Sequence, residues 1–230
     1  LESSVALAER AVSQHAEQPQ GLLRIAAPMI SGQYFLPAVI DEYLRLYPDM
    51  RVEMIIKDSF QDLVSSGFDL AIRTGTLSDS SLRARRLVES RWYAYASPDY
   101  LDTHGYPSVI DDLEMHNCLQ FSYQETGANE WPVTTGGKPG KIRVQGRFEA
   151  SSLVTLREAA VSGMGIAFMP VYLAREQVKQ GLLLPILQER IYRDVGIYAI
   201  YPNIRYVPRK ISAFIDLLSR NYAEQCCEFH

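Results

Sequence analysis

The sequence predicts an α/β protein of two lobes, each with a Rossmann-like mixed sheet that is mainly parallel. Residues 22–73 alternate strand, helix, strand, helix and strand, and parallel strands in that order need crossover helices. Residues 98–195 repeat this alternation, which indicates a second sheet. Apolar strand segments such as 70–72 run into polar loops, and open α/β sheets bind their ligands at such strand ends.

The first lobe is predicted from residues 21–95 and 199–230. Apolar side chains at helical spacing predict its first helix, which Pro48 ends. Gly75 allows a sharp turn after the third strand. The expected strands are 22–27, 51–56, 69–73 and 85–97, and the expected helices are 33–47, 60–66 and a final one from near Pro208.

The second lobe is predicted from residues 96–198, joined to the first by two crossing strands near 95–97 and 198–202. Gly163 and Gly181 are expected to end helices. The expected elements are strands at 118–123, 141–148, 165–169 and 195–201, helices at 151–162 and 171–180, and a glycine-rich hairpin turn at 134–141. Both lobes then contain a strand, a serine-bearing loop and a helix, with Ser31 in one lobe and Ser151 in the other.

Residues 1–20 are predicted to be the end of a linker helix. Apolar residues at positions 1, 5, 8 and 12 follow a 4-3-4 spacing typical of a short coiled-coil seam. An isolated amphipathic helix is the alternative. A chain that starts within a helix suggests part of a longer protein.

The bulk composition is that of an ordinary globular protein. Of its 230 residues, 47% are apolar and 22% charged, and the formal net charge is −4. That charge does not favour strong nucleic-acid binding by the chain itself. Three cysteines make no disulfide framework, so a reduced, cytoplasmic location is expected. No apolar run is long enough for a membrane span.

The sequence contains no recognisable catalytic set, so we expect neither an enzyme nor a cofactor. His116 and Cys118 could share a metal, but a histidine satisfied at a helix end is the simpler interpretation, and no metal site is expected. Asp111 and Asp112 could act as acid and base, although carboxylates at a helix start usually cap it. The glycines at 163 and 165 follow a helix rather than a strand, which disfavours dinucleotide binding.

The residues favour a binding site. Ser31 and Ser151 or Ser152 stand where a strand leads into a helix, so their hydroxyls and the next N–H groups, such as those of Gly32 and Gln33, could hold an anion. The alternative is that these serines only cap their helices.

Two residues at the end of the third strand belong to the same prediction. Thr74 would line the mouth of the site. Arg73 could pair with an anionic ligand or with a carboxylate such as Asp69, and both alternatives stay open.

A series of short motifs resembles the effector-binding domain of LysR-type transcriptional regulators. In chain order they are Leu23-x-Ile25-x-Ala27-Pro28, Leu36-Pro37, Tyr47-Pro48, the segment DLAIRTGTLSDSSLRARR at 69–86, Ala96-Ser97-Pro98-x-Tyr100-Leu101, Asp112-Leu113-x-x-His116-x-Cys118 and Gly163-x-Gly165-Ile166-Ala167-x-Met169-Pro170. The resemblance extends over nearly the whole chain from Gly21, and the 69–86 segment is similar to a subgroup with a D-S-S-L-x-A-R loop.

The resemblance implies the fold of periplasmic type 2 binding proteins, with a small effector between the lobes. It implies effector contacts from Ser31, Thr74, Ser97, Ser151, Phe168 and Pro202. Many relatives carry Asn-Asp where this chain has Ser151-Ser152, so their ligand preferences should not be transferred.

It also implies the partners: a small effector, a second copy of the chain, and DNA only through an N-terminal helix-turn-helix domain absent from this sequence. The anionic or polar character expected of the effector comes from the helix starts at Ser31 and Ser151. The dimer would pair the 33–47 helix with helix 152–162 of an antiparallel partner, with Ile40 as a test position, and the full-length protein would be a tetramer. The alternative function on this fold is a solute-binding protein of a transporter.

Overall fold

The computed structural model describes residues 18–56, 67–75, 82–123 and 127–226. The chain divides into two compact units. Unit 1 contains residues up to Val88 together with those from Ile197, and unit 2 runs from Glu89 to Gly196. Residues 1–17 of the predicted linker helix, the predicted helix at 60–66 and residues 76–81 of the segment that resembles the family's D-S-S-L-x-A-R loop lie outside the described residues.

Unit 1 is built on a mixed sheet with the strand order β2-β1-β3-β11. β1 pairs in parallel with β2 and β3, whereas β11 is antiparallel to β3. The elements are β1 (Gly21–Ala27), η1 (Ser31–Phe35), α2 (Leu36–Leu46), β2 (Met50–Ile56), β3 (Leu70–Thr74), the start of β4 (Leu82–Ala96), the end of β11 (Arg193–Pro202) and α6 (Arg209–Cys226). The predicted parallel arrangement of the first three strands is confirmed.

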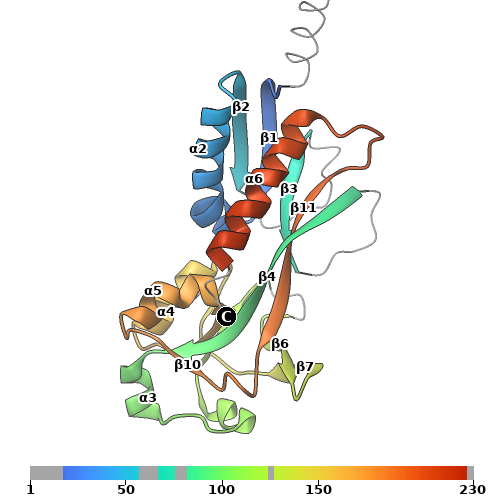
Figure 1. Cartoon of the computed structure of the whole chain (residues 1–230). Helices are drawn as coiled ribbons and strands as arrows, with labels where there is room; N and C mark the ends of the chain where they lie inside the picture. Colours follow the sequence, from blue (N-terminus) through green and yellow to red (C-terminus); the bar gives the residue numbers. More distant parts are fainter. Residues whose placement is uncertain (1–17, 57–66, 76–81, 124–126, 227–230) are drawn as a thin grey trace, which may run out of the picture. The chain divides into compact units, whose positions relative to one another are not determined.

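Aromatic side chains hold α2 against α6, which lie side by side in unit 1 (Figure 1). Phe35 stacks on Tyr222 with ring centroids 4.7 Å apart. The ring of Tyr43 meets the edge of Phe214, and its hydroxyl donates to the carbonyl oxygen of Lys210 at 2.8 Å. Burial raises the pKa of Tyr43, so this hydroxyl keeps its proton.

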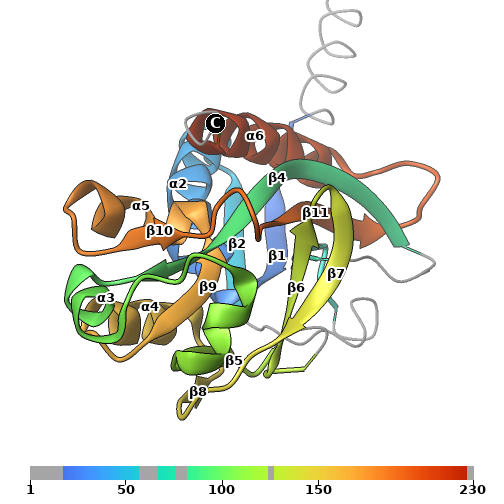
Figure 2. The ribbon, with the colours of Figure 1, turned by 90° about the horizontal axis from the view of Figure 1, so that it is seen from below.

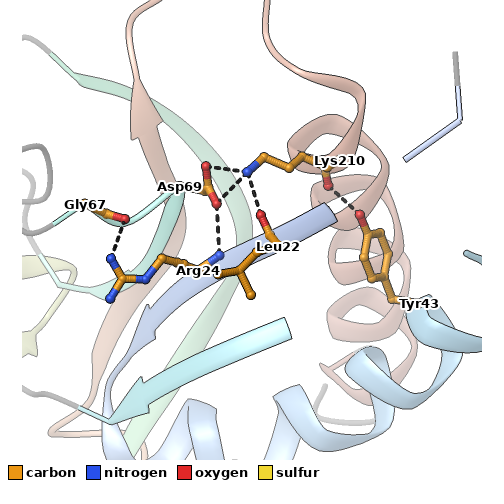
Figure 3. Close-up of polar contacts among 6 residues, drawn as sticks. All are labelled: Leu22, Arg24, Tyr43, Gly67, Asp69 and Lys210. Atoms are coloured by element: carbon orange, nitrogen blue, oxygen red, sulfur yellow. Dashed lines mark hydrogen bonds and ion pairs between the residues drawn. The ribbon is translucent and has the colours of Figure 1, made fainter. Parts of the chain in front are cut away.

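A polar network joins three distant parts of unit 1 (Figure 3). The Lys210 ammonium lies 2.8 Å from the Asp69 carboxylate and donates to the Leu22 carbonyl oxygen at 2.7 Å. Asp69 also accepts the backbone N–H of Arg24 at 2.9 Å, and the Arg24 guanidinium donates to the Gly67 carbonyl oxygen at 3.2 Å. The network therefore ties the beginning of α6 to β1 and to the turn before β3.

Unit 2 contains a second set of α/β elements. β9 is parallel to β5, which is parallel to β8, while β4 is antiparallel to β9 and β10. The elements are α3 (Pro98–His104), η2 (Ile110–Met115), β5 (Cys118–Phe121), β6 (Glu130–Thr135), β7 (Lys138–Arg143), β8 (Glu149–Ala150), α4 (Leu153–Val161), β9 (Ile166–Pro170), α5 (Val171–Lys179) and β10 (Leu184–Ile186). Gly163 and Gly181, with φ of 78° and 71°, end α4 and α5 as predicted.

One predicted strand of unit 2 is wrong. Residues 141–148 do not form one strand, because β7 ends at Arg143 and pairs with β6 as a separate two-stranded sheet (Figure 2). Gly136 and Gly137 both have positive φ and form a tight hairpin turn, so the strand starts directly after them. The two-residue strand β8 leads into α4 instead. β10 is an element that the sequence analysis did not predict.

The two crossing strands are β4 and β11, each of which runs from one unit into the other. Apart from the β6–β7 pair, the described strands belong to one hydrogen-bonded order in which β11 is the neighbour of β4. Both strands are long enough to contribute residues to each unit. The units divide at Val88–Glu89 and Gly196–Ile197, whereas the sequence placed the crossings near 95–97 and 198–202.

Candidate functional site

In unit 1, Ser31 lies just beyond the carboxyl end of β1, inside a helix that has already begun. Residues 29–30 are helical, and Ser31 opens the π-helical segment η1. The residue is buried (2% exposed), and no hydrogen bond of its hydroxyl is found among the described residues. Ser31 is therefore not a helix cap. Its place in a π-helical turn is consistent with a binding role, because such turns occur frequently at functional sites.

The two residues after Ser31 differ in what they can offer a ligand. The N–H of Gly32 donates to the Pro28 carbonyl oxygen at 2.9 Å, so it is already used within the helix. A Cβ on Gly32 would come 2.0 Å from Cδ1 of Ile56, so glycine allows this helix to approach β2 closely. Gln33 is exposed.

Two other candidates of unit 1, Arg73 and Thr74, lie at the same edge of the sheet as Ser31, whereas Pro202 does not. Thr74 is exposed and Arg73 half-buried at the carboxyl end of β3, which is parallel to β1. The register pairs Thr74 with Ile197 and runs antiparallel, so Pro202 lies five residues further along β11. At about 3.4 Å per residue that is about 17 Å away, toward the opposite end of β3.

The pairing of Arg73 with Asp69 is not observed. Asp69 instead holds Lys210 and the backbone N–H of Arg24. Four residues of extended strand separate Arg73 from Asp69, about 13 Å, which explains why the two side chains do not meet.

In unit 2, the two adjacent serines have different roles. Ser152 is the N-cap of α4, and its hydroxyl accepts the Thr155 N–H at 3.3 Å. Ser151 is exposed and directly follows β8. The capping alternative therefore holds for Ser152 but not for Ser151.

The other two unit 2 candidates are buried. Ser97 caps α3 by accepting the Tyr100 N–H at 3.3 Å. The β4–β9 register pairs Tyr95 with Ala167, so Ser97 lies near the amino end of β9, away from Ser151. Phe168 is fully packed, with its ring stacked on Trp131 at 5.3 Å and tilted against Trp92 at 5.8 Å.

Trp92 is a candidate that sequence reasoning missed. It pairs with Pro170 at the carboxyl end of β9, the edge that Ser151 also occupies. Its indole N–H is buried and has no partner among the described residues. A buried hydrogen-bond donor without an acceptor is uncommon. The sequence could not reveal this one, because an aromatic residue in a strand pattern does not show whether its N–H will find an acceptor.

The remaining polar candidates have structural explanations. The Asp112 carboxylate accepts the N–H groups of Ser108 and Val109 at 2.7 and 2.9 Å, and these bonds lower its pKa. The capping interpretation of this residue is confirmed. Burial raises the pKa of Cys118 to about 12, so its thiol stays protonated and is a poor nucleophile or metal ligand. Within the described ranges, no group of three metal-binding side chains occurs.

The family model of the LysR substrate binding domain matches residues 16–223. This chain therefore belongs to that family, which consists of transcriptional-regulator domains and is not an enzyme family. None of the described helices is long and apolar enough to cross a membrane.

Named relatives and solved structures agree with this assignment. The chain is 34% identical over 214 residues to the HTH-type transcriptional regulator CrgA of Neisseria meningitidis serogroup C, covering 92% of this chain and 70% of that protein. It is 30% identical to the HTH-type transcriptional activator AaeR of Escherichia coli K12, covering 90% and 66%.

Two solved structures show the same likeness in three dimensions. The CrgA regulatory domain from Neisseria meningitidis superposes with a TM-score of 0.77 at 30% identity, covering 88% of this chain and 98% of that one. The full-length virulence activator AphB of Vibrio cholerae gives a TM-score of 0.77 at 28% identity, covering 95% and 74%. The predicted periplasmic type 2 binding protein-like fold is confirmed.

Proposed function

We propose that this chain is the effector-sensing domain of a LysR-type transcription regulator. The match over residues 16–223 carries this proposal, since the relatives named above are helix-turn-helix regulators. They favour it over a solute-binding protein of a transporter. DNA would be contacted by a helix-turn-helix domain outside these 230 residues, and the regulator would work in the cytoplasm, where that DNA lies.

The proposed effector is a small anionic or polar molecule. In unit 1 it would be contacted by Ser31 and Thr74, with Arg73 and Gln33 beside them. In unit 2 it would be contacted by Ser151. The Ser31 hydroxyl supports this best, because it has no described partner and is not among the buried polar atoms sealed from solvent, so a ligand oxygen can reach it and hydrogen-bond to it.

Ser31→Ala is expected to weaken the response to the effector without lowering the stability of the free protein. The probes are benzoate, succinate and related small carboxylates in a thermal-unfolding screen. A hit at a hundredfold excess over its Kd should stabilise the wild-type chain by about 2.7 kcal/mol. Because the Ser31 hydroxyl caps nothing, the free variant should unfold at the wild-type temperature.

Ser152→Ala is the matched control. Loss of this cap should lower the stability of the free protein by about 1 kcal/mol while the ligand response remains. A full response in Ser31→Ala would remove Ser31 from the site. A screen in which no carboxylate stabilises the wild type would contradict an anionic effector.

We also propose that the domain forms a homodimer in which α2 and β2 pack on α4 of an antiparallel partner. β2 is an edge strand of the described sheet, and Ile55 and Ile56 are each 39% exposed. Leu46 on α2 is exposed as well, whereas Ile40 is half-buried. Apolar surface on an edge strand and its neighbouring helix is typical of an interface.

Ile40→Asp is expected to convert this dimer to a folded monomer at micromolar concentration, as measured by light scattering, because a charge would enter the apolar contact. Leu182→Asp, at an exposed apolar position of unit 2, is the control and should stay dimeric. An unmutated chain that is monomeric at this concentration would count against the interface. A tetramer is proposed only for the full-length regulator.

A further inference from the structure

A cavity of about 370 Å³ opens within unit 2 beside α3. Its walls include Tyr100, His104, Glu114, His116 and Arg147, which come from α3, η2 and the segment before β8. None of the proposed effector contacts lines it. The volume is within the range of small-molecule sites.

The best-defined polar group in this cavity is the His116 imidazole. The residue is only 7% exposed, and its Nδ1 lies 3.2 Å from the Tyr100 hydroxyl. That hydroxyl accepts the Asn117 N–H at 2.9 Å, so its own proton is directed to Nδ1. The imidazole proton is then on Nε2.

The Nε2–H of His116 has no acceptor among the described residues, and it is not among the buried polar atoms that are sealed from solvent. It is therefore presented to the cavity that the ring lines. Burial and the neighbouring His104 lower the pKa of His116, so at neutral pH this group is a neutral donor rather than a cation.

Two opposite charges share the cavity wall with His116. Neither the Arg147 guanidinium nor the Glu114 carboxylate forms an ion pair in the part of the chain that the structure describes. The backbone N–H of Arg147 donates to the Asn117 Oδ1 at 2.8 Å, which holds this part of the cavity wall in place. Gly146 packs directly on the Cys118 carbonyl oxygen, where a Cβ would come 1.9 Å away.

We propose that this cavity is a second ligand site, which binds a small molecule carrying both a carboxylate and an ammonium group, such as a free amino acid. The carboxylate pairs with Arg147 and accepts the Nε2–H of His116. The ammonium group pairs with Glu114. A ligand with both charges satisfies both side chains at once, which a simple anion or cation cannot do.

The test compares glycine with its two halves, acetate and methylamine, by isothermal titration calorimetry on the whole chain. Glycine should bind at least about tenfold more tightly than either half, because it makes both charge-assisted contacts. Arg147→Met should weaken glycine binding by about tenfold or more, and Glu114→Gln should reduce it to the level of acetate. Both positions are exposed, so the variants should fold.

Arg143→Met removes an exposed arginine of unit 2 outside the cavity and should leave glycine binding unchanged. Ser31→Ala should also leave it unchanged, which separates this site from the proposed effector site. The proposal is overturned if glycine does not bind at millimolar concentration, or if acetate binds as tightly as glycine. It is equally overturned if Arg147→Met and Arg143→Met have the same effect, or if Ser31→Ala abolishes glycine binding.

Discussion

Trp131→Ala is expected to destabilise the protein by about 3–5 kcal/mol. Trp131 is 1% exposed, and its side chain stacks on Phe168 with an interplanar angle of 18°. It therefore joins the β6–β7 hairpin to β9, and its removal would leave a large cavity between them. Urea unfolding followed by circular dichroism measures the loss.

Two variants make this result specific. Trp131→Phe keeps an aromatic ring against Phe168, so the loss of stability should be clearly smaller than for Trp131→Ala. Of the two tryptophans in the sequence, this variant keeps Trp92. Tyr123→Ala removes an exposed aromatic side chain of unit 2 and should change stability by less than about 0.5 kcal/mol. A loss below about 1 kcal/mol for Trp131→Ala would show that the hairpin is not held by this stack.

Gly165→Ala is expected to cost about 3 kcal/mol, the upper part of the usual range for overpacking. A Cβ at this position would come 2.0 Å from the carbonyl oxygen of Asn117. The obstacle is backbone, and that same oxygen accepts the Ile166 N–H at 2.9 Å where β9 joins β5. The added methyl group must therefore push these two strands apart.

Gly163→Ala is the control for backbone conformation, because Gly163 has φ of 78° but its Cβ would meet only the Ser97 hydroxyl oxygen, at 3.7 Å. The left-handed conformation should cost about 1–2 kcal/mol. Thermal unfolding of both variants compares the two effects. An equal or smaller loss in Gly165→Ala would mean that the strands separate easily.

The sequence predicted the first half of the fold well because its apolar patterns are clear there. β1 and β3 are buried runs, and α2 has a buried face of Leu36, Val39 and Tyr43. The π-helical turn at Ser31 was not predictable, since a one-residue shift in hydrogen bonding leaves the apolar pattern unchanged.

The division between the units was harder to predict. β4 runs for 15 residues through Val88–Glu89 without a glycine or proline, so nothing in its sequence signals the crossing. Ser97 directly follows β4, and Pro202 is the last residue of β11. In the structure, the strand registers place Ser97 and Pro202 away from the edges occupied by Ser151 and Thr74.

The hydrogen bond from Lys210 to the Leu22 carbonyl oxygen has a consequence for how the chain folds during synthesis on the ribosome. The described part of unit 2 belongs to one continuous stretch, so its residues emerge together and can fold as soon as the stretch is complete. Unit 1 cannot be finished at that time, because Lys210 must still arrive to contact Leu22, 188 positions earlier. The β1–β2–β3 region would therefore wait, with the surface that α6 later covers open to chaperones, until translation has passed residue 210.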